Sequence, residues 1–281
     1  MADKKRLTKE EKIEYLYSII ESDDYSDDYP SMLANYVDDE DPEVRALAIS
    51  GLWDYPRPEM IDTLFDKAKN DPSQEVRSAA IATLGRYIYE GEMADYDFDW
   101  GAIDALIRED ELPKEDFLRV KSFLLKIFRD ESEPLALRGA ALEALGFLTE
   151  PEILDLIAAA YTRPEIEMKL SAISAMGRGG SERWKDFLLR ELENPEKKIK
   201  LEAIRAVGEA SFNEAAPKLR ELSQSKDKEV RLEAIWALGQ VGTKEDREFL
   251  ETCAQEEEDE EVREIAQAAL FEIDTWDMLS E

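Results

Sequence analysis

The sequence predicts an all-α protein whose fold is an α-solenoid, a superhelix of about seven helix–turn–helix repeats. Three observations lead to this prediction. A short motif recurs along most of the 281 residues, amphipathic stretches with helical periodicity separate its copies, and no segment shows the alternating pattern of a strand. Because stacked repeats grow by addition, chain length does not count independent domains here.

The recurring motif consists of an aliphatic anchor, a basic residue directly after it, and an alanine four residues after it. Successive anchors are 32, 61, 31, 31, 31 and 32 residues apart. The anchor and the residues four and eight positions later share one helical face, and a small side chain at the fourth position lets two helices approach closely. The anchors are Val44, Val76, Leu137, Met168, Ile199, Val230 and Val262.

Charged residues flank each anchor. The basic residue after it is Arg or Lys in every copy, and an acid precedes it by three residues in five copies. An acid at this place suits a helix N-terminus, where it caps the helix or complements its dipole. Stacked copies therefore predict a ladder of bases and acids between neighbouring repeats. The five acids are Asp41, Glu165, Glu196, Asp227 and Asp259.

A glycine stands nine residues after the anchor in the five inner copies. Glycine there suits a helix end or a close crossing of two helices. The first and last copies carry Trp53 and Phe271 instead, and atypical end copies are expected because a terminal repeat lacks one neighbour. The glycines are Gly85, Gly146, Gly177, Gly208 and Gly239.

We expect a single solenoid over residues 1–281. Amphipathic stretches such as 58–68, 151–161 and 183–192 supply the first helix of a repeat. The predicted parts are an N-terminal cap over 1–28 with a helix over 8–20, repeats one and two over 29–89, an insertion over 90–114, and repeats three to seven with a C-terminal cap over 115–281. The insertion follows from the 61-residue spacing, in which no second anchor fits.

The charge of the chain restricts its partners. It has 67 acidic against 36 basic residues and a net charge of −31. Such a chain repels nucleic acids and anionic membranes and attracts basic proteins, so we expect a partner that is a protein, basic or with a basic segment. Two acidic blocks, 21–43 and 256–261, are either solvated turns and helix starts or an electrostatic platform. Without a signal-peptide core or a membrane-length apolar stretch, we expect a cytoplasmic protein.

Residues that support catalysis are missing or are not arranged for it. The chain has no histidine, which removes the usual Ser-His and Cys-His nucleophiles. Cys253 is the only cysteine, and its place in a helical pattern favours packing over reactivity. The glycine-rich stretch 176–184 lacks the lysine and spacing of a phosphate-binding loop. We therefore expect no enzyme activity and no cofactor.

The blocks EVRSAAIATLG at 75–85 and EVRLEAIWALG at 229–239 resemble HEAT repeats, in particular the short HEAT-like repeats of phycobilin lyase subunits. The resemblance covers residues 29–273 and implies an α-solenoid, most often a non-enzymatic scaffold. It leaves two alternatives open: a lyase- or chaperone-like subunit acting on a bilin protein, and an acidic inhibitor or immunity-type protein. Related deoxyhypusine hydroxylases bind iron through His-Glu motifs that this chain lacks, and related DNA glycosylases use a basic groove that its charge opposes.

A candidate partner surface follows from the helical register of the motif. If the anchor and the residues four and eight after it face the core, the residues two, three and six after it point away. The leucines two after the anchor then form an exposed apolar stripe or tuck against the next repeat, and geometry favours both equally. Leucine and tryptophan rimmed by charge are typical of an interface hot spot. The predicted surface comprises Leu170, Leu201, Leu232, Trp236, Arg205, Glu202 and Glu233.

This register also predicts how the tryptophan of that surface behaves. An exposed Trp236 contributes to binding and little to packing. We therefore expect Trp236→Ala to weaken partner capture while leaving the melting temperature nearly unchanged.

Residues 95–101 of the insertion read DYDFDWG, and three aspartates stand where a calcium loop has its first ligands: Asp95, Asp97 and Asp99. Such a loop needs glycine sixth and glutamate twelfth, but this one has Trp100 and Leu106. The aspartates are therefore only a weak metal candidate. The aromatics Tyr96, Phe98 and Trp100 either brace the loop against the solenoid or face a partner.

Overall fold

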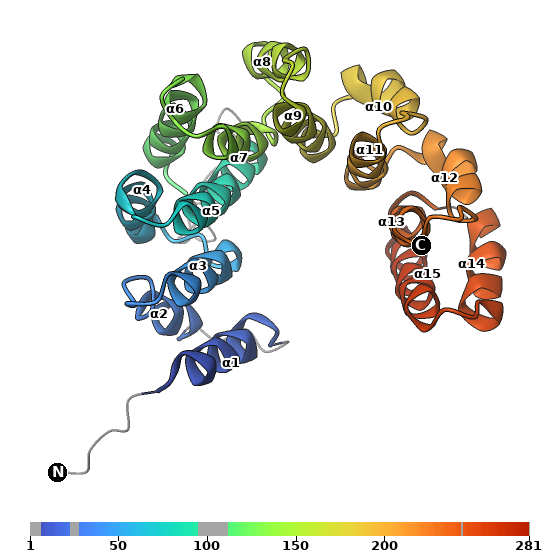
Figure 1. Cartoon of the computed structure of the whole chain (residues 1–281), viewed down its shortest axis with the longest axis horizontal. Coiled ribbons are helices and arrows are strands. Elements are labelled where there is room, and N and C mark those ends of the chain that lie inside the picture. Colours follow the sequence, from blue (N-terminus) through green and yellow to red (C-terminus); the bar gives the residue numbers. More distant parts are fainter. Residues whose placement is uncertain (1–6, 23–27, 95–111, 243, 281) are drawn as a thin grey trace, which may run out of the picture. The chain divides into compact units, whose positions relative to one another are not determined.

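The computed structural model describes residues 7–22, 28–94, 112–242 and 244–280, and of 244, 245, 256 and 274–280 only the backbone. The predicted all-α solenoid is confirmed (Figure 1). The described residues form fifteen α-helices with short 3-10 turns, and they contain no strand. None of these helices is both long enough and apolar enough to cross a membrane.

The chain divides into two compact units, and each is described by itself. The N-terminal unit, residues 1–148, begins with α1 (Lys9–Ile20), which packs on α3. Three helix pairs follow: α2 (Tyr29–Ala34) with α3 (Pro42–Gly51), α4 (Ile61–Asn70) with α5 (Gln74–Met93), and α6 (Lys114–Arg129) with α7 (Leu135–Leu145).

The C-terminal unit, residues 149–281, contains four more helix pairs. The seven pairs of the chain correspond to the seven predicted repeats, and each anchor lies on the second helix of its pair. The four pairs are α8 (Pro151–Tyr161) with α9 (Ile166–Gly179), α10 (Lys185–Glu191) with α11 (Lys197–Glu209), α12 (Ala216–Leu222) with α13 (Lys228–Val241), and α14 (Lys244–Glu256) with α15 (Glu260–Ser280).

Helix α1 caps the first repeat as the sequence predicts. Thr8 is its N-cap: the side chain of Thr8 accepts a hydrogen bond from the backbone N–H of Glu11, and the Glu11 carboxylate accepts one from the N–H of Thr8. This reciprocal arrangement satisfies two N–H groups that a helix start leaves unpaired. Leu16 and Ile19 are buried, so the apolar face of α1 covers the first repeat.

The motif accounts for the core of every repeat. All seven anchors are at most 7% exposed, and the alanine four residues after each anchor is fully buried in every repeat. Burying one large aliphatic side chain contributes about 1.5–3 kcal/mol before the entropy of ordering it is subtracted. The periodic burial therefore supplies each repeat with its own share of core, as a solenoid requires.

The glycine nine residues after the anchor serves mainly as a close crossing, the second of its two predicted roles. Only Gly146 stands at a helix end. A Cβ added to Gly177 would lie 2.7 Å from Cα of Ala206 on the next second helix, and one added to Gly239 would lie 2.7 Å from Cα of Ala269. The second helices of these two pairs, α9 with α11 and α13 with α15, therefore approach each other at backbone distance.

The partner of each such glycine is a second small residue, seven positions after the next anchor. Ala206 and Ala269 hold this place, and so does Ala144, whose Cα lies 3.3 Å from a Cβ built on Gly85. In the second repeat the place belongs to Thr83, whose hydroxyl donates to the carbonyl oxygen of Ile49 at 3.0 Å. The crossing thus needs two small residues, one nine positions after an anchor and one seven positions after the next anchor. The sequence predicted only the glycine at the ninth position.

We predict that Gly177→Ala destabilises the protein by about 1–3 kcal/mol. Alanine improves helix propensity, but its Cβ would clash with the Ala206 backbone, which cannot move as a flexible side chain does. Urea unfolding followed by circular dichroism measures the change. Gly85→Ala is the matched control, because the nearest backbone atom there is 3.3 Å away. A Gly177→Ala variant as stable as Gly85→Ala would contradict the close crossing.

Candidate partner-binding surface

In three repeats the arginine after the anchor clamps the turn between the two helices of its own repeat. Nη1 of Arg45 donates to the carbonyl oxygens of Asp39 and Glu40, and Nη1 of Arg231 donates to those of Ser225 and Lys226. Arg263 donates in the same way to two carbonyls five and six residues before it. These arginines satisfy carbonyl groups of the turn between the two helices, so their role is structural.

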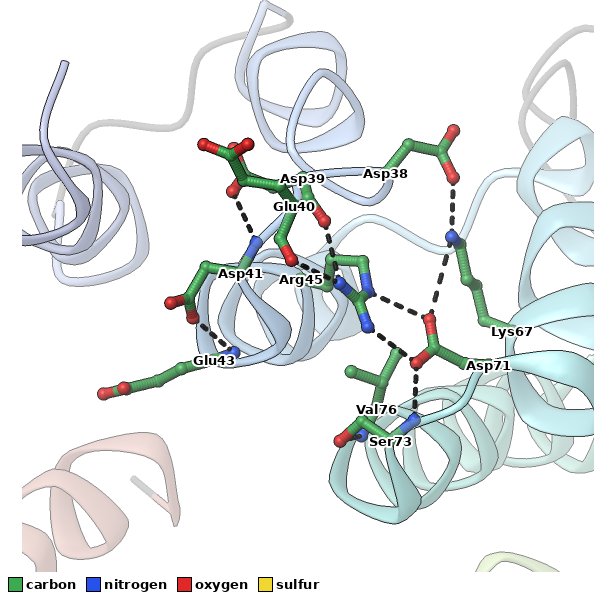
Figure 2. A network of polar contacts seen from close by, with 10 residues as sticks. All are labelled: Asp38, Asp39, Glu40, Asp41, Glu43, Arg45, Lys67, Asp71, Ser73 and Val76. Atoms are coloured by element: carbon green, nitrogen blue, oxygen red, sulfur yellow. Dashed lines mark hydrogen bonds and ion pairs between the residues drawn. The ribbon is translucent and has the colours of Figure 1, made fainter.

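Arg45 also links its repeat to the next one (Figure 2). Its Nε and Nη2 atoms lie 2.9 and 2.8 Å from the two carboxylate oxygens of Asp71, whose side chain is 3% exposed. Asp71 also accepts from the backbone N–H of Ser73. Burial acts to raise the pKa of Asp71, but the hydrogen bonds from Arg45 and Ser73 outweigh it and leave the pKa below its ordinary value.

A charge ladder connects successive repeats, and two kinds of base contribute to it. In the N-terminal unit it is the predicted base after the anchor, since Arg45 contacts Asp71 and Arg77 contacts Glu133. In the C-terminal unit a base that was not predicted forms it. The lysine two residues before the anchor reaches the acids that precede the next anchor by three and by one. Lys197 contacts Asp227 and Glu229, both at 2.7 Å. Lys228 contacts Asp259 at 2.8 Å and Glu261 at 2.6 Å. In the cap, Lys9 contacts Asp41 and Glu43 in the same way.

One acid of each acidic block holds a helix start. Asp41 accepts from the backbone N–H of Glu43 at 2.9 Å, and Asp259 accepts from that of Glu261 at 3.1 Å. Asp227 caps α13 similarly, whereas Glu165 and Glu196 occupy N-cap positions without a side-chain cap bond. Aspartate reaches the N–H groups of the first turn, and glutamate is one methylene longer. Helix starts therefore account for the three aspartates, Asp41, Asp227 and Asp259.

The charged members of the predicted surface join two neighbouring repeats of the C-terminal unit. Nε and Nη2 of Arg205 on α11 lie 2.9 and 3.2 Å from the carboxylate oxygens of Glu233 on α13. Nη1 of Arg205 also lies 4.0 Å from Glu202. The hydrogen bond with Glu233 raises the pKa of the guanidinium, and half of the Arg205 side chain remains exposed.

The apolar members lie between the two predicted arrangements. Leu170, Leu201 and Leu232 are half-buried, so each leucine is partly covered and partly in water. Trp236 is also half-buried, and its Cζ3 atom lies 2.9 Å from the position that a Cβ would take on Gly208 of the preceding second helix. The indole therefore fills the space that this glycine leaves, which revises the expectation that Trp236→Ala leaves the melting temperature nearly unchanged.

Two predicted features have different outcomes. Residues 95–101 lie outside the described part of the chain. Two proposals for this loop therefore stay predictions: a metal site at Asp95, Asp97 and Asp99, and a bracing or partner-binding role for Tyr96, Phe98 and Trp100. In the described ranges no group of three or more His, Cys, Asp and Glu side chains could hold a metal ion.

Cys253 is half-buried. Its burial and, to a smaller degree, the charge of Glu257 raise the pKa of its thiol.

An aromatic cluster in the N-terminal unit was not predicted. The ring of Phe147 lies 6.1 Å from that of Trp53 and 5.5 Å from that of Tyr89, centroid to centroid. Trp53 also lies over a glycine, because its Cζ3 atom is 3.5 Å from a Cβ built on Gly85. The positions of two of these aromatics in the motif could have indicated the cluster, since Trp53 stands nine residues after one anchor and Phe147 ten residues after another.

Comparisons with known proteins agree with this architecture. A family model described as HEAT repeats matches residues 30–108 and 186–270, more than half of the chain. The CpcE–CpcF complex of phycocyanin lyase from Nostoc sp. PCC7120 contains a chain of similar fold, with a TM-score of 0.52, 18% identity and 89% coverage of both chains. At this identity the similarity establishes the fold alone.

Two more solved structures are similar over most of this chain, with TM-scores below 0.5. Escherichia coli YibA has a TM-score of 0.47 and 15% identity, and the match covers 97% of this chain and 99% of YibA. Kap95p, solved with RanGDP, has a TM-score of 0.49 and 14% identity, and the match covers 93% of this chain and 38% of Kap95p. No curated protein matches the sequence.

We predict that Asp71→Asn destabilises the protein at pH 7 by about 1.5–3 kcal/mol, because the buried Arg45 guanidinium loses its charged partner. The folded-state pKa of Asp71 is lowered, so its contribution is complete above the unfolded-state pKa and disappears as the pH falls through the folded-state value. The difference between wild type and variant should therefore shrink below about pH 4. Urea unfolding at several pH values measures it.

Asp38→Asn is the matched control for this prediction. Asp38 also pairs with a base, Lys67, but its side chain is 83% exposed, and such pairs contribute about 1 kcal/mol or less. Equal losses for the two variants at pH 7, or an Asp71→Asn difference that does not change with pH, would contradict the assigned role of Asp71.

Proposed function

This chain belongs to the HEAT-repeat family, and on that premise we propose that it is a non-enzymatic scaffold whose second-helix surface in the C-terminal unit binds a protein segment that is both basic and apolar. The observation that supports the proposal is a repeated position. Leu170, Leu201 and Leu232 stand at the same place on α9, α11 and α13, and all three keep part of their surface in water. Single exposed leucines are common on protein surfaces and need no explanation, but leucines at the same position of three successive repeats favour a binding surface.

Trp236 and the pair of Arg205 with Glu233 adjoin this row of leucines. Tryptophan and arginine are the residues most enriched in binding hot spots, and a partly buried indole already has a fixed orientation. Because Arg205 is held by two hydrogen bonds to Glu233, a partner meets this charged group in one geometry and orders little on binding.

Charge defines the partner more closely. Three bases near the leucines contact carboxylates: Lys197 and Lys228 each contact two, and Arg205 contacts Glu233. With a net charge of −31 in the whole chain, the surrounding field is negative. A segment that carries Lys or Arg beside large apolar side chains complements both properties, and its association should weaken as salt is added.

The chemistry of the described residues supports binding over catalysis. The chain has no histidine, and the raised pKa of Cys253 keeps its thiol protonated and weakly nucleophilic. The carboxylates with lowered pKa, such as Asp71, Asp227 and Asp259, are held by bases and helix starts. The alternative function, a lyase- or chaperone-like subunit that acts on a bilin protein, is supported only by the shared fold. A binding scaffold needs no catalytic residues.

We predict that Trp236→Ala strongly reduces partner capture, and Trp53→Ala is its matched control. Both indoles are half-buried and lie over a glycine of a neighbouring second helix, so both substitutions should lower the melting temperature modestly. Only Trp236 belongs to the proposed surface. The measurement is affinity capture from native lysate at about 50 mM and about 500 mM salt, since the higher concentration screens charge beyond a few ångströms.

The expected result is a basic protein that wild type and Trp53→Ala retain at low salt, that high salt releases, and that Trp236→Ala fails to retain. If Trp236→Ala and Trp53→Ala captured the partner equally well, the proposal that the partner binds the second-helix surface would be wrong. A partner that is acidic, or whose capture does not depend on salt, would contradict the electrostatic part of the proposal.

A further inference from the structure

A groove on the first-helix side of the N-terminal unit has a composition unlike the rest of the chain. It runs along α6 and is closed on one side by Phe65 of α4. Helix α6 carries five basic residues against two acidic ones, in a protein with an excess of 31 acids. Its sequence, KEDFLRVKSFLLKIFR, places these bases beside large apolar residues.

Aromatic and aliphatic side chains form the floor of the groove. The rings of Phe65 and Phe123 stack at 4.2 Å between centroids with an interplanar angle of 22°. Leu118, one turn of α6 before Ser122, is 48% exposed, one of the few large apolar side chains of the described residues with this much surface in water. The exposed floor is therefore apolar and held in place by the stacked pair.

The groove consists of two hollows that follow α6 and share Phe123. On α6 one hollow is lined by Lys114, Glu115, Leu118, Arg119 and Ser122, and the other by Lys126, Ile127 and Asp130. These positions recur every three or four residues, so they lie on one face of the helix. Sixteen residues of α-helix span about 24 Å, which is the length of about four turns of a partner helix.

Basic side chains form the rim. Lys69 of α4 and Lys126 of α6 line the groove and are exposed. Arg119 holds its guanidinium 5.6 Å from the centre of the Phe65 ring while it contacts Asp62 and Asp116, so it forms a wall.

Three acids also line the groove: Glu115, Asp130 and Glu133. Glu133 accepts from Arg77 at 2.7 Å. The hydrogen bonds from Ser132 and, to a smaller degree, the charge of Lys126 lower the pKa of Asp130, so Lys126 has a carboxylate near it. The lining still holds five bases against these three acids, so a partner that supplies carboxylates complements it. The bases are Lys69, Arg77, Lys114, Arg119 and Lys126.

We propose that the groove along α6 is a separate docking site, which binds an acidic amphipathic helix of a partner protein. The apolar face of such a helix covers Leu118, Phe65 and Phe123, and its carboxylates meet Lys69 and Lys126 at the rim. This is the helix-in-groove mode of recognition, in which apolar side chains at helical spacing give affinity and the rim charges select the partner. The groove is proposed to bind an acidic partner and the surface on α9, α11 and α13 a basic one, so the two sites bind different partners.

The test uses a fluorescein-labelled helical peptide of about 18 residues with glutamates on one face and leucine and phenylalanine on the other. Fluorescence anisotropy measures its affinity for the full chain. Lys69→Glu with Lys126→Glu should weaken binding at least about tenfold, and Leu118→Ala should weaken it without changing any charge. The matched control is Lys198→Glu with Lys226→Glu, two exposed lysines of the C-terminal unit, which should leave the affinity unchanged.

Trp236→Ala should also leave this affinity unchanged, which separates the test from that of the proposed function. Both lysine pairs are exposed, so thermal unfolding of the two double variants should match that of wild type. No binding of the acidic peptide, or equal losses for the groove and control variants, would overturn the proposal. Binding that requires residues 95–111 to be replaced by a glycine–serine linker would overturn it too, because it would assign the groove to the chain itself.

Discussion

A glycine on one second helix faces an alanine on the next in four pairs of helices, and the other interactions between these repeats depend on this contact. The pairs are α5 with α7, α9 with α11, α11 with α13, and α13 with α15. In the C-terminal unit, Gly177 faces Ala206 and Gly239 faces Ala269 with no room for a Cβ. Because the backbones approach so closely, the step from one repeat to the next is set by atoms that cannot change rotamer. Side chains beside the crossing then find the same neighbour in each repeat.

The charge ladder is one consequence of this fixed step. A lysine can hold two carboxylates of the next repeat, as Lys197 and Lys228 do, only if the following helix start lies at a constant distance. The ladder helps the protein to carry its large excess of acids, since carboxylates that cap helices and contact lysine repel one another less than free ones. The pKa of Asp227 and of Asp259 is lowered mainly by the hydrogen bond from the lysine, as this account requires.

The sequence alone was enough to predict the anchors, the buried alanines and the helical pairs, because these depend on periodicity within one segment. It did not show which base pairs with which acid. The partners Arg45 and Asp71, or Lys228 and Asp259, lie 26 and 31 residues apart, and their pairing depends on where the next repeat begins. The packing role of Trp236 was missed for the same reason, since Gly208 lies on another helix.

The positions that fix the repeat and the positions that face water are different, and this separation explains how one fold can present surfaces of opposite charge. The crossing uses the residues seven and nine after the anchor, and the core uses the anchor and the residue four after it. On the second helices, the places of Leu201 and Arg205 can therefore vary with modest effect on the step between repeats, whereas Trp236 also packs on Gly208. On the first helices, which take no part in the glycine crossings, α6 can collect bases around Phe123 in an acidic protein. A scaffold of this kind can acquire a second partner by changing exposed residues of one helix, because the backbone contacts that hold its repeats together are made elsewhere.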